Sequence, residues 1–272
     1  HATGNVSDEI RQYVGQLAAG ERLELADSPI ASVVVLPALY EKYAFQPLWR
    51  NPDSVRQLEA AIDSIHLDGL NPADYHREAL RRLQQDAQAQ TGQARQAELD
   101  IVLTDSLVRL GYHLQIGKVD PEALDSDWNM NRKLPGLDPV LALSDAIDTG
   151  KVTELIASFR PQAAAYRNLM AALAHYRDLQ AQGGWPGIPD GDALKPEMEH
   201  ERIPALRQRL HITGDMPAED LNSTLFDSNV EAGVRHFQQR HGLDDDGVVG
   251  KGTLAALNVP VEERIDQIRV NL

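Results

Sequence analysis

A glycine-rich turn between two helical patterns, within residues 230–259, is the feature that most constrains how this chain can fold. Val230, Val234 and Phe237 recur at helical spacing, so they lie on one face of a helix that must bury this face against a core. Gly242 follows soon after, and glycine readily takes the left-handed conformation that ends a helix. The pattern therefore predicts a packed helix that stops at this glycine.

The chain then turns and enters a second short helix. Residues 244–247, Asp-Asp-Asp-Gly, have the composition of a polar turn, because Asp and Gly tolerate the backbone conformations that turns require. The two valines at 248–249 return to the core, and the second helix extends through Leu257 to a stop near Asn258 and Pro260. Helix, turn and helix together indicate a small helical module.

The spacing of residues from Val234 to Leu257 is specific and reads V-x-x-F-Q-x-x-x-G-L-x-x-D-G-x-x-G-x-x-T-x-x-x-L. This pattern resembles the small helical peptidoglycan-binding domain found in many wall enzymes. The resemblance implies a module of three helices over residues 201–260. The first of these helices would carry its inward face on Ile203, Leu206 and Leu210.

The chain before this module also has helical periodicity. Apolar residues recur at helical spacing within residues 7–19, 52–69, 91–118, 138–150 and 153–182, and a further helix starts after Asn71 and Pro72. Ser7 is the expected cap of the first helix, and Pro161 is expected to split the last stretch into two. Residues 21–28 alternate in polarity, which is typical of a short strand. The predicted fold class is all-α, with room for a few short strands.

The longest apolar stripe predicts a helix at the centre of a bundle. It consists of Leu99, Leu103, Leu107, Leu110 and Leu114, spaced by three or four residues. A stripe of about four turns is too short for a heptad coiled coil, so we expect the helix to be surrounded by others.

Residues 183–204 are rich in glycine and proline, which cannot form one helix, and they indicate a domain boundary. Trp185 and Ile188 in this stretch nevertheless have the character of packed side chains. The predicted organisation is a helical scaffold domain over 1–200, the three-helix module over 201–260, and a remnant of a linker over 261–272.

Five stretches extend the resemblance over nearly the whole chain: FQPLW at 45–49, DGLNPADYH at 68–76, LTDSLVRLGYHLQIGKVDP at 103–121, GGWPGIP at 183–189 and VPVEERIDQIRVNL at 259–272. Together they resemble the YcbB-type L,D-transpeptidases. In that family a helical scaffold domain precedes the peptidoglycan-binding module, and a YkuD catalytic domain follows it. The resemblance implies a parent enzyme that cross-links wall peptides in the periplasm of a Gram-negative bacterium.

The family's nucleophile is a cysteine in an S-x-G-C-x-R type motif, activated by a histidine. A thiolate suits this role because it attacks an amide carbonyl without a full proton abstraction in the transition state. This chain has no cysteine. We therefore expect no catalytic residue within it, and we expect its own missing catalytic domain to be a partner.

The composition excludes several other functions. A net charge of −15 disfavours nucleic acid, because binding phosphates requires clustered Lys and Arg, and it disfavours anionic membrane surfaces for the same reason. No apolar run approaches the roughly 20 residues of a membrane-spanning helix. The absence of cysteine excludes disulfides and thiolate metal sites.

No metal or cofactor is expected. If Gly247 is aligned with the invariant glycine of a calcium-binding EF-hand loop, Gly242 and Thr253 occupy the first and twelfth ligand positions, and neither supplies a carboxylate. His236 and His241 are five positions apart rather than the four that stack on one helix face. Most of the scattered histidines, His66, His76, His175 and His211, are expected at the surface.

The expected function is recognition of peptidoglycan, a stem peptide or a glycan strand, by polar residues beside the glycine-rich turn. The candidates are Arg235, Gln238, Gln239, Arg240, Asp246 and Thr253. Arginine would pair with a stem-peptide carboxylate and glutamine with its amides. For two of them a structural role is an equal alternative: Gln238 would bond the turn backbone, and Thr253 would cap a helix.

Two other functions stay open. One is an autonomous glycan-cleaving enzyme, a muramidase or lytic transglycosylase, which needs a buried Glu as general acid. Glu122 and Glu154 stand at helix starts, where capping and the helix dipole explain them. The other is a pure protein-interaction scaffold. Trp49, Trp128 and Trp185 have the aromatic faces that stack on sugars, although packing is the expected role of each.

Overall fold

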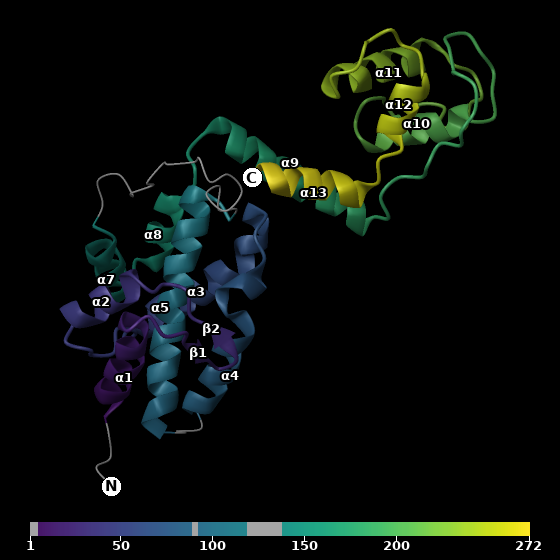
Figure 1. Cartoon of the computed structure of the whole chain (residues 1–272). Coiled ribbons are helices and arrows are strands. Elements are labelled where there is room, and N and C mark those ends of the chain that lie inside the picture. Colours follow the sequence, from purple (N-terminus) through teal and green to yellow (C-terminus); the bar gives the residue numbers. More distant parts are fainter. Residues whose placement is uncertain (1–4, 89–91, 119–137) are drawn as a thin grey trace. The chain divides into compact units, whose positions relative to one another are not determined.

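The computed structural model describes residues 5–88, 92–118 and 138–272 and divides into two compact units, His1–Arg167 and Asn168–Asn271 (Figure 1). Within the described residues the fold is helical, with two strands of two residues each. This confirms the predicted all-α class. No helix of the described part is long and apolar enough to cross a membrane.

The first unit contains α1 (Val6–Ala18), β1 (Glu24–Leu25), β2 (Ser28–Pro29), α2 (Val35–Lys42), α3 (Pro52–Ser64), the 3₁₀ turns η1 (Ile65–Asp68) and η2 (Pro72–Tyr75), α4 (Arg77–Gln88), α5 (Gly92–Ile116), α7 (Pro139–Thr149) and α8 (Val152–Phe159). The two strands pair antiparallel, with Glu24 opposite Pro29. Helix α9 (Ala164–Ala181) starts in this unit and continues into the second.

The first helix begins earlier than the sequence predicted. Its cap is Asn5 rather than Ser7, because the Asn5 side chain accepts the Asp8 amide while the Asp8 carboxylate accepts the Asn5 amide. This reciprocal pair satisfies two backbone donors at once, which one serine cannot do. The predicted inward face, Ile10, Val14 and Leu17, is buried.

Helix α5 is the centre of the first unit, as the leucine stripe predicted. Leu103, Leu107, Leu110 and Leu114 are buried, and α5 packs against α1, α4 and α8 (Figure 1). The sequence pattern did not indicate that α5 also buries Asp100, Thr104, Asp105 and Ser106. A buried polar group must be hydrogen-bonded to be tolerated, so each of these side chains needs a partner from another segment.

The Asp105 carboxylate holds two other segments, residues 31–32 and His76, against α5. It accepts the Ser32 amide at 2.7 Å and the Ala31 amide at 3.1 Å, and it lies 2.6 Å from His76 Nε2. The other ring nitrogen of His76 lies 2.5 Å from the Ser28 hydroxyl. His76 is 2 % exposed, unlike His66 and His175, which lie at the surface as was expected of most of the scattered histidines; its carboxylate and hydroxyl partners satisfy both ring nitrogens in the interior.

A second carboxylate on α5, that of Asp100, fixes the segment after α2. It accepts the Tyr40 hydroxyl at 2.7 Å and the backbone amides of Leu48 and Trp49 at 3.0 Å. The indole of Trp49 donates to Thr104 at 2.9 Å. Trp49 is thus a packed side chain, the role that was expected for it, whereas Trp128 lies outside the described residues.

Helices α8 and α9 are separated at Pro161, as predicted. The join is fixed by Asp68, whose carboxylate receives Arg160 through two nitrogens at 2.8 and 2.9 Å and the Tyr166 hydroxyl at 2.7 Å. A bidentate arginine–carboxylate pair restricts the orientation of the two groups as well as their distance. It therefore fixes the conformation of the chain directly after α8.

The second unit holds α10 (Ile203–Ile212), α11 (Ser228–Arg240), α12 (Lys251–Leu257) and α13 (Val261–Asn271) besides most of α9. Its core joins α10, α11 and α12 through the predicted inward faces: Ile203, Leu206, Leu210, Val230, Val234, Phe237, Leu254 and Leu257. A Cβ on Gly233 would lie 3.2 Å from the Asp215 carbonyl oxygen, so this glycine lets α11 approach that backbone closely.

The sequence placed a linker at residues 183–204 and the end of the first domain near residue 200. The compact units of the structure divide after Arg167, within α9. The glycine- and proline-rich stretch packs on the second unit, where Leu194 pairs with Val249 and Ile188 is buried. Burial of apolar side chains lowers the free energy of the folded state. This explains why a segment without regular secondary structure packs on the core.

Candidate functional site

The turn between α11 and α12 is built around two left-handed glycines. Gly242 has φ 64° and ends α11, and Gly247 has φ 77° at the far end of the aspartate run. A Cβ on Gly247 would lie 3.0 Å from Arg235 Nε and 3.1 Å from Glu231 Cγ, whereas a Cβ on Gly242 would meet nothing within 4 Å. Gly247 is therefore favoured by its backbone conformation, and a Cβ at this position would displace the side chains of Arg235 and Glu231.

Gln238 holds this turn from inside. It is 1 % exposed, and its amide nitrogen donates to Asp246 Oδ1 at 2.9 Å and to the Val248 carbonyl at 3.0 Å. Its amide oxygen accepts the Gly247 amide at 2.9 Å. The structure thus shows the backbone bonds of the structural alternative for Gln238. With both ends of the amide engaged, its role is to shape the turn.

Thr253 and Asp246 complete this internal network. Thr253 lies inside the first turn of α12, whose cap is Gly250 with no side-chain cap bond, so the helix-capping alternative for Thr253 is wrong. Its hydroxyl lies 3.1 Å from the Gln238 amide nitrogen instead. Asp246 accepts the Val248 amide at 2.9 Å, and this bond, followed by that from Gln238, lowers the pKa of its exposed carboxyl.

Arg235 and Gln239 reach the same turn from the outer side of α11. Arg235 pairs with Glu231 at 2.9 Å and donates to the Asp245 carbonyl, and Gln239 donates to the Asp245 carboxylate at 2.8 Å. Gln239 is exposed and the Arg235 side chain is 43 % exposed. Guanidinium, amide and carboxylate groups thus gather in contact with solvent. We call Arg235, Gln239 and Asp245 the polar edge.

Arg240 lies in a different cluster. Its guanidinium makes two bonds to Asp215, at 2.9 and 2.7 Å, and these bonds raise its pKa. Asp215 also lies 2.8 Å from His236 Nδ1 and accepts the Thr213 hydroxyl at 2.7 Å. Asp215 was not predicted as a functional residue, since an aspartate in a stretch with glycine and proline carries no distinctive signal.

Arg209 is a further buried cation that the sequence did not reveal. It is 1 % exposed, its guanidinium carbon lies 3.9 Å from the centroid of the Trp185 ring, and it donates to the Leu257 carbonyl at 2.8 Å. Burial lowers its pKa to about 10. The Trp185 indole nitrogen donates to the Val259 carbonyl at 3.1 Å. The Trp185 ring therefore packs on the domain, as expected.

These groups can bind a polar ligand through hydrogen bonds and charge. Across the described ranges, no group of three His, Cys, Asp or Glu side chains could hold a metal ion. Glu154 is an exposed residue in the first turn of α8, without the burial that a glycosidase acid needs, and Glu122 lies outside the described residues.

Replacing Gly247 by alanine is expected to lower the free energy of unfolding of the second unit by about 1–2 kcal/mol, the cost of left-handed backbone for an L residue. It should also displace Arg235. The matched variant Gly242→Ala carries the same backbone cost but leaves Arg235 in place, because its Cβ is in open space. Urea unfolding measures the first effect and the NMR signal of Arg235 Nε–H the second. An unmoved Arg235 signal in Gly247→Ala would contradict the close approach.

Two family models match the chain. Residues 35–173 match the family described as "Scaffold domain", which covers just over half of the 272 residues. Residues 199–257, which include α10, α11, the glycine-rich turn and α12, match "Putative peptidoglycan binding domain". No curated protein matches the chain.

Proposed function

Because the chain belongs to the Scaffold domain family and continues into a peptidoglycan-binding domain, we propose that it is the non-catalytic, wall-binding portion of an L,D-transpeptidase of the YcbB type. The order of the two domains along the chain is the observation that carries this proposal. The scaffold unit positions the enzyme, and the second unit holds the wall. The setting we propose is the periplasm of a Gram-negative bacterium.

The polar edge is where we propose that the second unit contacts peptidoglycan. Arg235 supplies a guanidinium whose planar fork matches a stem-peptide carboxylate, and Gln239 supplies an amide that bonds peptide groups. Gln238 and Thr253 support the turn from within, and we propose that they act by shaping it rather than by contacting the ligand. With a net charge of −15, the chain has no general attraction for an anionic wall, so the affinity must come from these local groups.

The chemistry of the parent enzyme lies outside these residues in this proposal. A transpeptidase of this type needs a thiolate nucleophile, and this chain has no cysteine. We therefore propose that a catalytic domain is the principal protein partner. Binding by the second unit would raise the concentration of wall peptides near that domain, in the way that linked modules raise effective concentration.

Co-sedimentation with insoluble, purified sacculi tests the proposal. The chain is expected to pellet with sacculi, and the double variant Arg235→Ala/Gln239→Ala is expected to bind about tenfold more weakly, since a hydrogen bond to a charged group contributes about 1.5–3 kcal/mol. The matched control is Arg269→Ala/Gln267→Ala, which removes the same two residue types from the exposed face of α13.

The outcomes separate this function from the two alternatives. A chain that stays wholly in the supernatant would contradict wall binding and favour a protein-interaction scaffold. A fall in the turbidity of the sacculus suspension caused by this chain would instead indicate a glycan-cleaving enzyme. Equal loss of binding in the polar-edge variant and in the control would exclude the polar edge as the contact.

A further inference from the structure

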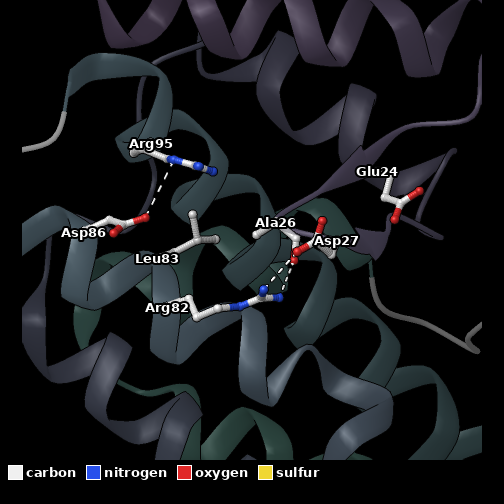
Figure 2. A pocket seen from close by; sticks show the side chains of 7 residues that line it. All are labelled: Glu24, Ala26, Asp27, Arg82, Leu83, Asp86 and Arg95. Atoms are coloured by element: carbon white, nitrogen blue, oxygen red, sulfur yellow. Dashed lines mark hydrogen bonds and ion pairs between the residues drawn. The ribbon is translucent and has the colours of Figure 1, made fainter.

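A polar cavity in the first unit has no role in the function proposed so far. Its volume is about 490 Å³, and its lining is formed by Glu24, Ala26, Asp27, Arg82, Leu83, Asp86 and Arg95 (Figure 2). Cavities that hold small ligands measure roughly 300–1,000 Å³. The size therefore suits part of a small molecule or a short peptide.

The walls of this cavity are held by the interior of the unit. The hairpin β1–β2 turns at Ala26 and Asp27, both in left-handed backbone, and is tied to α5 through Ser28, His76 and Asp105. From α4, Arg82 donates to the Ala26 carbonyl at 2.8 Å and pairs with Asp27 at 2.8 Å. A site supported in this way is largely formed before a ligand arrives, which reduces the entropy lost on binding.

The cavity is lined by charged side chains of both signs, and these side chains differ in how well they are paired with protein groups. Arg82 is paired with Asp27, while the nearest approach of Arg95 to Asp86 is 3.7 Å, longer than a hydrogen bond. Another nitrogen of Arg95 bonds Glu98 at 2.6 Å. Glu24 is exposed, and within the described chain its carboxylate has no hydrogen bond or ion pair. Figure 2 shows Glu24 and Arg95 on opposite sides of the cavity.

We propose that this cavity binds a short peptide bearing a free ammonium and a free carboxylate, with the ammonium at Glu24 and the carboxylate at Arg95. A simple anion would face the carboxylates of Glu24, Asp27 and Asp86, and a simple cation would face two guanidinium groups. A ligand with separated opposite charges meets a partner at each end. The atoms between them would lie near Leu83, which also lines the cavity.

The identification of this peptide rests on the proposed wall-binding function. A murein stem peptide that contains a diamino acid has a free amine followed by a terminal carboxylate. The scaffold unit would then hold the peptide part of the wall through a site of its own.

Isothermal titration of the full chain with the tetrapeptide L-Ala-γ-D-Glu-meso-diaminopimelate-D-Ala tests the proposal. The titration is made in the Arg235→Ala/Gln239→Ala background, so that the polar edge does not contribute. Glu24→Gln and Arg95→Gln are each expected to weaken binding about tenfold, the effect of losing one charged contact. The controls Glu41→Gln and Arg56→Gln change exposed residues of the same unit outside the cavity and should leave the affinity unchanged.

Chemical changes in the peptide give a second, independent measurement. Acetylating its amines or amidating its terminal carboxylate should each weaken binding as strongly as the protein variants do. Unchanged affinity for the acetylated peptide, or for Glu24→Gln and Arg95→Gln, would overturn the proposal. Thermal unfolding followed by circular dichroism checks that the variants remain folded.

Failure of this proposal is distinguishable from failure of the proposed function. If the chain sediments with sacculi but does not bind the tetrapeptide in the polar-edge background, the cavity proposal is overturned and wall binding stands. If the peptide binds with the expected charge dependence but sacculi are not bound, the cavity proposal is supported and the proposed function fails.

Discussion

Replacing Asp105 by alanine is expected to lower the free energy of unfolding of the first unit by about 3–5 kcal/mol, because several donors lose their acceptor and each buried donor left unsatisfied costs about 1–3 kcal/mol. The carboxylate is fully buried and satisfies two backbone amides, those of Ala31 and Ser32, as well as His76. Without it the Ser32 amide and the His76 ring are left in the interior without this acceptor. The cost is large because these buried groups cannot reach water.

Urea unfolding followed by circular dichroism measures this loss, and hydrogen exchange at the Ala31 and Ser32 amides locates it. Asp148→Ala is the matched control, because Asp148 is an exposed aspartate on α7. A loss below about 1 kcal/mol for Asp105→Ala, no more than a typical surface change, would contradict the interpretation of this network.

Acid pH should weaken the same network. Burial raises the pKa of Asp105, but hydrogen bonds from His76 and Ser32 outweigh it and hold the pKa below its usual value of 3.8. A carboxyl whose folded pKa is lowered stabilises the fold above its unfolded pKa and loses this contribution as pH falls through the folded pKa. The stability difference between the parent and Asp105→Asn should therefore be constant above pH 3.8 and shrink below it. A stability difference that stays constant as the pH falls well below 3.8 would contradict the lowered pKa of Asp105.

Replacing Phe237 by alanine is expected to cost the second unit about 3–5 kcal/mol, because a large cavity opens in a close-packed core. Phe237 is 0 % exposed, its ring stacks on His241 at 3.9 Å between centroids, and Arg209 lies 5.5 Å from its centroid. The loss should reach the glycine-rich turn, since Gln238, which holds this turn, follows Phe237 on α11.

Hydrogen exchange separates this effect from a change elsewhere. Peptides from α10, α11 and α12 should lose protection in Phe237→Ala, while peptides from α5 keep theirs. The milder variant Phe237→Leu retains most of the buried volume and should lose less stability. Equal stability of Phe237→Ala and the parent would show that the ring is not part of a packed core.

The helices that define the second unit could be predicted because their signals are local. Val230, Val234 and Phe237 share a face through the geometry of one helix, and the structure buries all three. Gly242 and Gly247 were assigned to a turn by the freedom of glycine, and both have positive φ. For Gln238, however, the pattern left two roles open, because its partners become neighbours only when the turn closes.

The buried polar side chains of the first unit had no comparable signal. Asp100 and Asp105 lie on the helix that the leucine stripe identified, but a periodicity argument assigns aspartates to the solvent face. Their partners at Tyr40, Trp49 and His76 come from distant parts of the chain. The cap of α1 was misplaced for a similar reason: Asn5 and Ser7 are both capable caps, and the backbone geometry selected Asn5.

The amino-acid sequence by itself determined where helices form, which faces they bury and where glycine must turn the chain, because these depend on groups a few residues apart. The tertiary structure decided which polar groups face one another: Asp105 with His76, Asp215 with Arg240, and the opposed charges of Glu24 and Arg95 around one cavity. Such pairings depend on how whole helices pack. The residues around a carboxylate in the sequence do not specify which distant side chain becomes its partner in the folded protein.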